Sequence, residues 1–391
     1  MYKITREIKK DNNELLRISI AGKVDSNNAA LVEKELMDIV HDNANLPIVI
    51  NAKELEYISS AGLRVILKLV KIDPELEIIN VCNDVYEIFE MTGFTEMVTI
   101  KKAYREFSVD GCTIIGEGAK GIVYRYNDDT IIKVYKKDDC LPQIQREREL
   151  AKKAFILGIP TAISYDCVKV GDNYGSVFEL LDCKSLSQLI QADPDNIEKY
   201  AKGFADLLKQ IHSTRVRSSD FSNGKSILTE WIDFSRYYLG EEITNKLSNM
   251  VRDLPERLTL IHGDYHTNNV MVQNGELLLI DMDTLCYGHP IIELGIVDFT
   301  YNTYNDIKRG NVEEFLGISH DQAKAVYKIF LKEYFETDDE EELKKYTDKI
   351  DLISYLRVIK HVSRRDCDKV KIDKAVSEIK RLIDGIDTLD F

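Results

Sequence analysis

The chain has 391 residues, 44% of them hydrophobic and 30% charged, which is enough for two or three domains that each bury their own core. Its 52 Lys and Arg residues against 67 Asp and Glu give a net charge of −15, so it lacks the cationic surface that binds nucleic-acid phosphates or anionic lipid. The seven cysteines are scattered and form no C-x-x-C pair, which excludes a disulfide framework and a cysteine-type zinc site. No apolar run is long enough to span a bilayer, and the first residues do not form a signal peptide. We therefore expect a cytoplasmic protein with no nucleic-acid or membrane partner.

Residues 1–103 alternate between strand and helix patterns. Strands are expected at residues 15–20, 47–50 and 77–81, and helices at 29–40, 59–70 and 84–91. Short strands that alternate with helices predict a small α/β domain.

After about residue 103 the pattern changes. Short apolar runs around a glycine cluster predict antiparallel hairpins at residues 114–115, 122–124 and 131–135. Beyond Leu186 helices are expected at 197–212, 321–335, 341–363 and 369–385, with one hairpin at 270–280 that turns on Asn274-Gly275. These patterns predict a second domain over residues 104–391, with a β-rich N-lobe at about 106–182 and a helical C-lobe at about 183–391.

The strongest chemical signal is the run H-G-D-Y-H-T-N-N at residues 262–269, followed by I-D-M-D at 280–283. Asp264, Asn269 and Asp281 supply the groups that phosphoryl transfer needs. One carboxylate accepts or orients the proton of the attacking hydroxyl, while an amide oxygen and a second carboxylate hold Mg²⁺ against the phosphates.

A glycine-rich motif, G-x-G-x-x-G-x-V, lies upstream and consists of Gly116, Gly118, Gly121 and Val123. Backbone N–H groups of such a loop can approach phosphate oxygens because no Cβ intervenes. A strand follows these glycines, whereas a dinucleotide-binding fold would have a helix there, so that fold is excluded.

Lys133 closes the strand that follows the glycine-rich motif, where it can meet the α- and β-phosphates. Glu147 or Glu149 could pair with that lysine from the next helix. Each part alone could be an ordinary structural feature, such as a hairpin or a helix cap, but their order along the chain favours a phosphotransferase.

Residues 106–391 resemble the aminoglycoside phosphotransferase/choline kinase family, which shares the bilobal protein-kinase-like α+β fold. The resemblance implies that Asp264 is the catalytic base and that Asn269 and Asp281 bind Mg²⁺. It also implies that Lys133 binds the phosphates of ATP or GTP and that Glu147 is its partner. The family's hinge, which holds adenine through backbone groups, falls at residues 179–182 and includes Glu179 and Leu181.

Two departures from protein kinases favour a small-molecule hydroxyl as the phosphate acceptor. Gly263 stands where protein kinases have an arginine that clasps a phosphorylated activation loop, and neither D-F-G nor A-P-E follows Asp281. We therefore predict an ATP- and Mg²⁺-dependent phosphotransferase. One alternative is a signalling protein whose kinase-like lobe senses nucleotide and whose N-terminal domain binds a protein regulator. The other is a protein kinase, whose substrate could be its own Ser60.

Acceptor-binding residues are expected within 187–255 and 285–391, in the variable helices and loops of the C-lobe. Trp231, Phe234, Tyr237 and Tyr238 could line such a pocket, although packing inside the helical lobe is the commoner role for aromatic side chains.

Residues 1–103 resemble the STAS domain of anti-sigma factor antagonists, in the runs G-K-V-D at 22–25, Y-I-S-S-A-G-L-R-V at 57–65 and M-T-G-F at 91–94. In that family a serine at the start of a helix is phosphorylated to control partner binding, and Ser60 is the matching position. A phosphate there would meet free helix N–H groups. Ser59 replaces the acidic residue usual in that family, and the alternative is that both serines only cap the helix. We expect this domain to regulate the protein or to bind a protein partner.

Overall fold

The computed structural model describes two compact units. The residues it describes are 2–9, 14–44, 46–118, 120–136, 140–181, 183–365 and 367–391. One unit comprises Met1–Ser108 with Cys167–Asp172, and the other comprises Val109–Asp166 with Asn173–Phe391. Among the described helices, none combines the length and apolar character required to cross a membrane.

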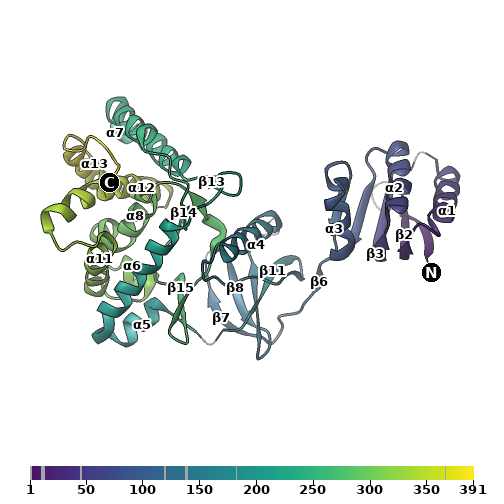
Figure 1. The fold of residues 1–391 in the computed structure, drawn as a ribbon, viewed down its shortest axis with the longest axis horizontal. Helices are drawn as coiled ribbons and strands as arrows, with labels where there is room; N and C mark the ends of the chain where they lie inside the picture. The colour runs from purple at the N-terminus through teal and green to yellow at the C-terminus, as the bar shows by residue number, and fades with distance from the viewer. Residues whose placement is uncertain are drawn as a thin grey trace. The chain divides into compact units, whose positions relative to one another are not determined.

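A five-stranded sheet with three helices forms the first unit (Figure 1). Its strands, in spatial order, are β1 (Lys3–Lys9), β2 (Leu15–Val24), β3 (Ile48–Ile58), β4 (Glu77–Val81) and β5 (Thr99–Lys102). The first pair is antiparallel and the others are parallel. The helices are α1 (Ala29–Asp42), α2 (Ser60–Ile72) and α3 (Asn83–Met91), followed by the short 3₁₀ helix η1 (Phe94–Glu96). The predicted α/β fold is therefore confirmed, with β1 and β5 as strands that the sequence pattern missed.

Strand β3 is much longer than the strand predicted at 47–50. Its buried residues alternate up to Ala52 and then recur every third position at Leu55 and Ile58. Two register shifts interrupt its pairing with β2 over the same stretch. Such bulges break the two-residue period of a strand, which is why the apolar pattern concealed the second half of β3.

In the second unit the strands β11, β9, β8 and β7 lie side by side in that order. Their bounds are β7 (Thr113–Glu117), β8 (Gly121–Arg125), β9 (Thr130–Tyr135) and β11 (Asn173–Glu179), and the helix α4 (Leu141–Ile156) follows β9. Neighbouring strands are antiparallel, as predicted for the hairpins around the glycine cluster. Strand β10 (Asp166–Val170) pairs in parallel with β6 (Arg105–Glu106).

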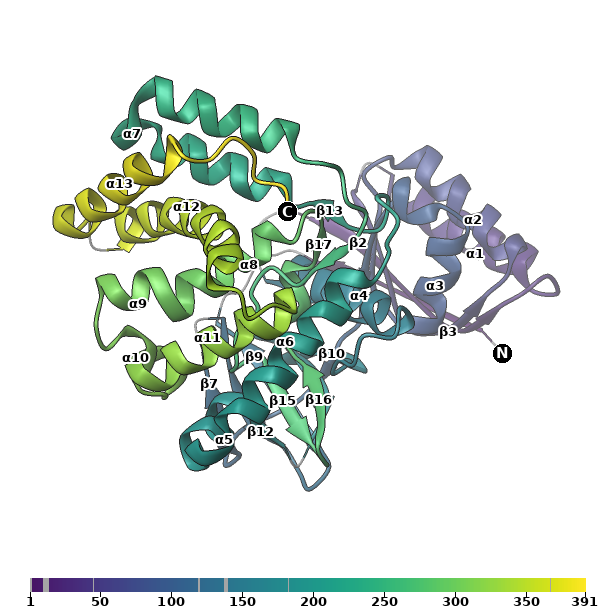
Figure 2. The same cartoon turned by 60° about the vertical axis from the view of Figure 1, so that its left-hand side comes forward.

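After Leu186 the chain is mainly helical, as predicted. The helices are α5 (Leu186–Ala192), η2 (Pro194–Asn196), α6 (Ile197–Ser213), α7 (Lys225–Asp253), α8 (Ile291–Asp298), the π-helix η4 (Phe299–Thr303), α9 (Tyr304–Ile307), α10 (Asn311–Leu316), α11 (His320–Phe335), α12 (Glu340–Arg365) and α13 (Lys369–Ile383). Helices α6 and α11 pack side by side, and α12 packs against α8 and α13 (Figure 2). The long α7 was not predicted because Gly240, with φ of 78°, breaks it into two segments that do not share one apolar face.

Two small sheets hold the segment that carries the candidate site. One has the order β12 (Lys184–Ser185), β15 (Val270–Gln273) and β16 (Glu276–Leu279), and the other β13 (Ser222–Asn223), β17 (Cys286–Tyr287) and β14 (Leu260–Ile261). The predicted hairpin is β15–β16, and its turn residues Asn274 and Gly275 both have positive φ, as a type I′ turn requires. Residues 262–269 link β14 to β15, and Asp281 follows β16 before the 3₁₀ helix η3 (Met282–Thr284).

The two serines before α2 have different surroundings. The Oγ of Ser59 accepts the N–H of Gly62 at 3.4 Å and caps the helix, whereas Ser60 is the exposed first residue of α2. We expect Ser59→Ala to destabilise α2 by about 1 kcal/mol, the usual value of an N-cap, and Ser60→Ala to have a much smaller effect. Hydrogen exchange of the α2 amides in the full chain measures both, and an equal or larger loss in the Ser60 variant would contradict the capping assignment.

Candidate active site

The loop 262–269 is anchored by side chains that point into the helical lobe. The hydroxyl of Tyr265 donates to the carbonyl of Phe204 at 2.6 Å, and the two rings stack with centroids 4.4 Å apart. Two residues on, the backbone N–H of Thr267 donates to the hydroxyl of Tyr301 at 2.9 Å. Tyr265 and Thr267 are fully buried, so their contacts with the helical lobe fix the backbone of the loop.

Glu293, in the first turn of helix α8, holds the same loop through its carboxylate. It accepts the N–H of Gly263 at 2.8 Å and that of Tyr265 at 3.2 Å. Complete burial raises the pKa of Glu293 to about 7, although the backbone N–H donors oppose this shift. The sequence reasoning missed this residue. The signal that could have found it is the single acid inside the apolar run I-I-E-L-G-I-V at residues 291–297. Such a run is expected to be buried, and an acid is rarely buried unless it has a partner.

Gly263 is required by the geometry of the loop. Its φ is +85°, and a Cβ there would stand 2.5 Å from the carbonyl oxygen of Thr284. The Thr284 hydroxyl in turn donates to the carbonyl of His262 at 2.7 Å, which ties the loop to the segment after Asp281. The glycine that distinguishes this site from protein kinases therefore also allows two segments to approach closely.

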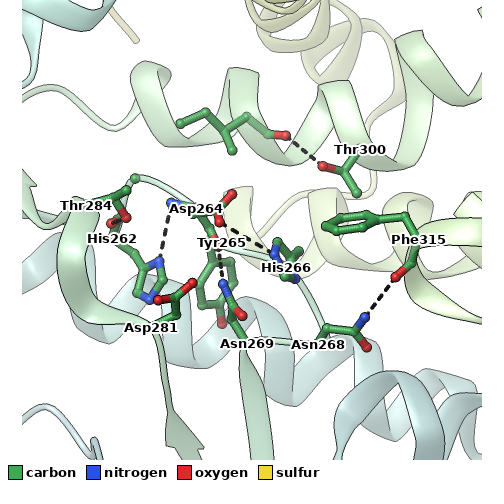
Figure 3. A network of polar contacts seen from close by, with 12 residues as sticks. His262, Asp264, Tyr265, His266, Asn268, Asn269, Asp281, Thr284, Thr300 and Phe315 are labelled. Carbon is green, nitrogen blue, oxygen red and sulfur yellow. Dashed lines mark hydrogen bonds and ion pairs between the residues drawn. The ribbon is translucent and has the colours of Figure 1, made fainter. Parts of the chain in front are cut away.

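Asp264 is half-buried and lies near His262 and His266, as Figure 3 shows, and near a third basic group, Arg357. The Nε2 of His266 is 3.7 Å from one carboxylate oxygen and the Nη2 of Arg357 is 4.0 Å from the other, while the Asp264 N–H donates to the Nδ1 of His262 at 3.3 Å. Burial raises the pKa of Asp264, but the interaction with His266 and the charges of Arg357 and His262 outweigh it and hold the pKa below its usual range. Asp264 is thus a carboxylate at neutral pH.

Asn269 and Asp281 lie beside the same loop, as Figure 3 shows. The amide nitrogen of Asn269 donates to the carbonyl of Asp264 at 3.0 Å, so the orientation of this amide group is fixed. Asp281 has φ 60° and ψ 61°, a left-handed conformation that costs energy in a residue other than glycine. The two predicted metal ligands, Asn269 and Asp281, therefore lie near Asp264, the predicted base.

Lys133 links the N-lobe sheet to Asp281. Its ammonium lies 3.1 Å from Glu147 on α4 and 3.3 Å from Asp281, and all three side chains are mostly buried. Burial lowers the pKa of Lys133, but the two carboxylates outweigh it and raise the pKa above its ordinary value. The other predicted partner, Glu149, is exposed on α4. Lys133 therefore stays charged and is held in place from two sides.

The glycines predicted to bind phosphate occupy one end of the N-lobe sheet. Gly116 on β7 is paired in register with Val123 on β8, and the N–H of Gly118 donates to the carbonyl of Gly121 at 2.9 Å across the turn between these strands. The predicted hinge residues lie elsewhere on the sheet. Glu179 ends β11 and Leu181 follows it, while Asp182 lies outside the described residues.

Lys120, on the glycine-rich turn, provides a test of whether Mg²⁺ fits this site. Its ammonium lies 3.3 Å from Asp281 and 2.6 Å from Asp283, so this place already attracts a cation. Among the described residues, no group of three or more His, Cys, Asp or Glu side chains gathers to hold a metal ion. Mg²⁺, however, is usually held by one or two carboxylates together with phosphates and water. The side-chain oxygens of Asn269 and Asp281, as potential metal ligands, fit that requirement.

The four aromatic residues for which packing and a pocket lining were both considered do not share one surface. Trp231 is buried in the core of the helical lobe, whereas Tyr237 is 88% exposed. The guanidinium of Arg357 lies over the Trp231 ring, 5.4 Å from its centroid. The sequence reasoning gave Arg357 no role, because no motif marks a residue that only the packing of α12 brings to Asp264.

Comparisons with known proteins match two separate parts of the chain to two different families. Residues 6–107 match the STAS domain and residues 111–303 match the phosphotransferase enzyme family. The chain is 36% identical over 90 residues to a putative anti-sigma factor antagonist, BtrV, of Bordetella bronchiseptica, which covers 22% of this chain and 77% of that protein. It is 27% identical over 109 residues to the anti-sigma-B factor antagonist of Listeria monocytogenes, which covers 27% of this chain and 95% of that protein.

Two of the solved structures that align with the chain are aminoglycoside phosphotransferases. A thermostable mutant of APH(4)-Ia aligns with a TM-score of 0.47 and 13% identity, over 70% of this chain and 94% of that one. The ADP-bound APH(2'')-Ib aligns with a TM-score of 0.45 and 17% identity, over 76% of this chain and 97% of that one.

The fold and the two family matches divide the chain into an N-terminal α/β part and a second part with a β-rich sheet followed by helices. The chain belongs to the STAS domain family through its N-terminal part, and residues 111–303 match the model of the phosphotransferase enzyme family.

Two glycines of the glycine-rich motif make different demands on the structure. A Cβ on Gly121 would stand 2.5 Å from the backbone oxygen of Val134 on β9, whereas a Cβ on Gly118 would meet nothing within 4 Å. We expect Gly121→Ala to lower Tm clearly, because the β8–β9 backbones must separate, and Gly118→Ala to leave Tm nearly unchanged. Thermal unfolding of the full chain measures both, and equal Tm values for the two variants would refute the steric argument.

The raised pKa of Glu293 predicts a pH-dependent stability. The pKa is about 7 in the folded chain and 4.5 for an ordinary glutamate, so the stabilising contribution is complete below pH 4.5 and is lost as pH rises through 7. We expect Glu293→Gln to remove this dependence, so that the Tm of the native chain relative to the variant falls between pH 5 and pH 8. Because other titrating groups are common to both chains, parallel Tm curves would show that Glu293 does not titrate in this range.

Proposed function

We propose that the protein is a phosphotransferase that uses ATP or GTP and Mg²⁺ to phosphorylate a hydroxyl group of a small molecule. Residues 104–391 would form the catalytic part, and residues 1–103 the STAS module for regulation or partner binding. The observation that carries the proposal is the contact of the Lys133 ammonium with both Glu147 and Asp281, at 3.1 and 3.3 Å. It joins the glycine-rich N-lobe to the segment that follows the Asp264 loop.

In this proposal the N-lobe residues bind the nucleotide. Lys133 binds its phosphates, and Glu147 keeps the ammonium charged and oriented for them. The turn of Gly116, Gly118 and Gly121, completed by Val123, presents backbone N–H groups to phosphate oxygens. Backbone groups near Glu179 and Leu181, between the two lobes, hold the base.

Asn269 and Asp281 would hold Mg²⁺ through an amide and a carboxylate oxygen. When bound, the ion neutralises charge on the phosphates and so stabilises the transition state. Asn269 is ready for this role because its amide nitrogen is already engaged by the carbonyl of Asp264.

Asp264 orients the acceptor hydroxyl and takes its proton as that oxygen bonds to the γ-phosphorus and the bond to the nucleoside diphosphate breaks. A carboxylate with a lowered pKa is a weak base, so orientation is its larger contribution and the proton moves late. This suits a loose phosphoryl-transfer transition state, in which the nucleophile needs little activation. The buried anchors Tyr265 and Glu293 keep Asp264 in position without contact with the reactants.

The STAS module would bind a protein partner, and phosphorylation of Ser60 would control that binding. The exposure of Ser60 at the first position of α2 supports this proposal, because a phosphate there adds charge at the surface next to free helix N–H groups. Mass spectrometry of the protein from its native host, with Ser60 unmodified under every growth condition, would remove the switch and leave the module as a binding domain only.

The role of Asp264 can be tested with an isosteric change. We expect Asp264→Asn to lower kcat by about 10²–10⁴-fold, the usual contribution of a positioned general base, while nucleotide binding is retained. Asp281→Asn should instead abolish Mg²⁺-dependent nucleotide binding. ADP release across a library of hydroxyl compounds measures turnover, and titration with AMP-PNP measures binding.

The matched control for Asp264→Asn is Asp233→Asn, on α7. Asp233 is exposed and pairs only with Arg236 among the described ion pairs, so the same substitution there should change neither turnover nor binding. Near-native turnover in the Asp264 variant would reject the assignment of this residue, and with it the proposed reaction centre.

A further inference from the structure

Arg357 lies beside the carboxylate that is proposed to orient the acceptor hydroxyl. It projects from α12, and its Nη2 is 4.0 Å from Asp264, too long for a hydrogen bond. One quarter of its side-chain surface stays accessible to solvent. An acceptor whose hydroxyl reaches Asp264 would therefore come next to this guanidinium.

Two aromatic rings hold the guanidinium of Arg357. Its central carbon lies 4.9 Å from the ring centroid of Phe299 and 5.4 Å from that of Trp231, within the range of cation–π contact. No hydrogen bond joins its N–H groups to any residue in the described part of the chain. The group is thus positioned by the two rings and by its charge contact with Asp264 rather than by hydrogen bonds, and its hydrogen-bond donors remain available.

The other cations on this side of α12 are already paired. Lys360 lies 2.7 Å from Glu230 on α7, and Arg364 lies 3.3 Å from the same carboxylate. Glu293 is near Arg357, but its two oxygens accept the loop N–H groups. Because Glu230 and Glu293 are already bound in this way, no carboxylate among the described residues accepts a pair of hydrogen bonds from Arg357. In that part of the chain this arginine is therefore a mostly buried cation whose hydrogen-bond donors have no anionic acceptor.

A guanidinium with free N–H groups is complementary to a carboxylate or phosphate, which can accept two parallel hydrogen bonds. A cationic amine in the same place would be repelled and would have to displace the guanidinium from its aromatic contacts. We propose, on the basis of the proposed function, that the acceptor is an anionic hydroxy compound whose carboxylate or phosphate group binds Arg357 while its hydroxyl lies at Asp264. Arg357 is then the residue that selects the acceptor by charge.

A purely structural role for Arg357 makes a different prediction. As a counter-ion of Asp264 it would orient that carboxylate equally for every acceptor, so its loss would lower kcat for all of them alike. As a binding group it raises the affinity for anionic acceptors only. Acceptors of one skeleton and different charge therefore separate the two roles.

Gluconate, glucitol and glucamine share one linear hexitol skeleton and carry negative, zero and positive charge. Calorimetric titration of each into the full chain with Mg²⁺ and AMP-PNP measures binding without turnover. A smaller set, glycerate, glycerol and 3-amino-1,2-propanediol, repeats the comparison for a short acceptor. We expect the anionic member of at least one set to bind about tenfold or more tightly than its neutral analogue, as charge-assisted hydrogen bonds allow.

Arg357→Met should remove this preference, and Arg357→Lys should keep only part of it, since lysine retains the charge and loses the planar pair of donors. Arg364→Met, on the same helix, is the matched control and should keep the preference, because Arg364 is paired with Glu230. In steady-state assays of ADP release, Arg357→Met should raise KM for the anionic acceptor more than it lowers kcat.

Neutral or cationic members that bind as tightly as the anionic ones, or no binding by either anionic probe, would overturn the inference. So would an anion preference that survives Arg357→Met. An anion preference that Arg357→Met removes, without ADP release from any acceptor, would support the binding site and reject only the proposed phosphotransfer. ADP release with glucamine but not with gluconate would support phosphotransfer and reject the role of Arg357.

Discussion

The contact between Lys133 and Asp281 is the interaction on which the site depends, because it joins the N-lobe sheet to the segment after β16 across 3.3 Å. Both groups are mostly buried, where an unpaired charge would be costly. Each compensates the other, and Glu147 provides a second carboxylate for the lysine. The left-handed backbone of Asp281 is sustained by this arrangement, since a strained conformation persists only where its surroundings impose it.

Two side chains that lie away from the candidate reaction centre hold the loop 262–269 in place. Tyr265 fills the core beneath the loop, and Glu293 binds its backbone from α8. A carboxylate in that place is costly to bury, and its raised pKa reflects the cost. The benefit is rigidity at Asp264, where, in the proposed reaction, small displacements would misalign the acceptor hydroxyl.

The sequence predicted those parts of the fold and the site that local pattern encodes. Hairpins around the glycines, the helices from α11 onward and the grouping of Asp264, Asn269 and Asp281 all follow from spacing along the chain. Glu293 and Arg357 escaped prediction because their roles come from contacts between α8, α12 and the loop, which leave no periodic signal. The second half of β3 and the helix α7 were not predicted for a different reason. There the local apolar pattern is itself interrupted, by bulges in β3 and by the break at Gly240 in α7.

Lys120 gives the acid pair Asp281 and Asp283 a counter-charge from the glycine-rich turn. If Asp281 takes a divalent ion as proposed, the two cations compete for one carboxylate, and the lysine must yield. In that case binding of the metal would free the Lys120 ammonium from the two acids, and the ammonium would then be available to the phosphates of a nucleotide. When no divalent ion is bound, Lys133 and Lys120 together balance the charge of Asp281, and Lys120 also balances that of Asp283, so the same lysine would oppose binding of a metal that arrives without its nucleotide.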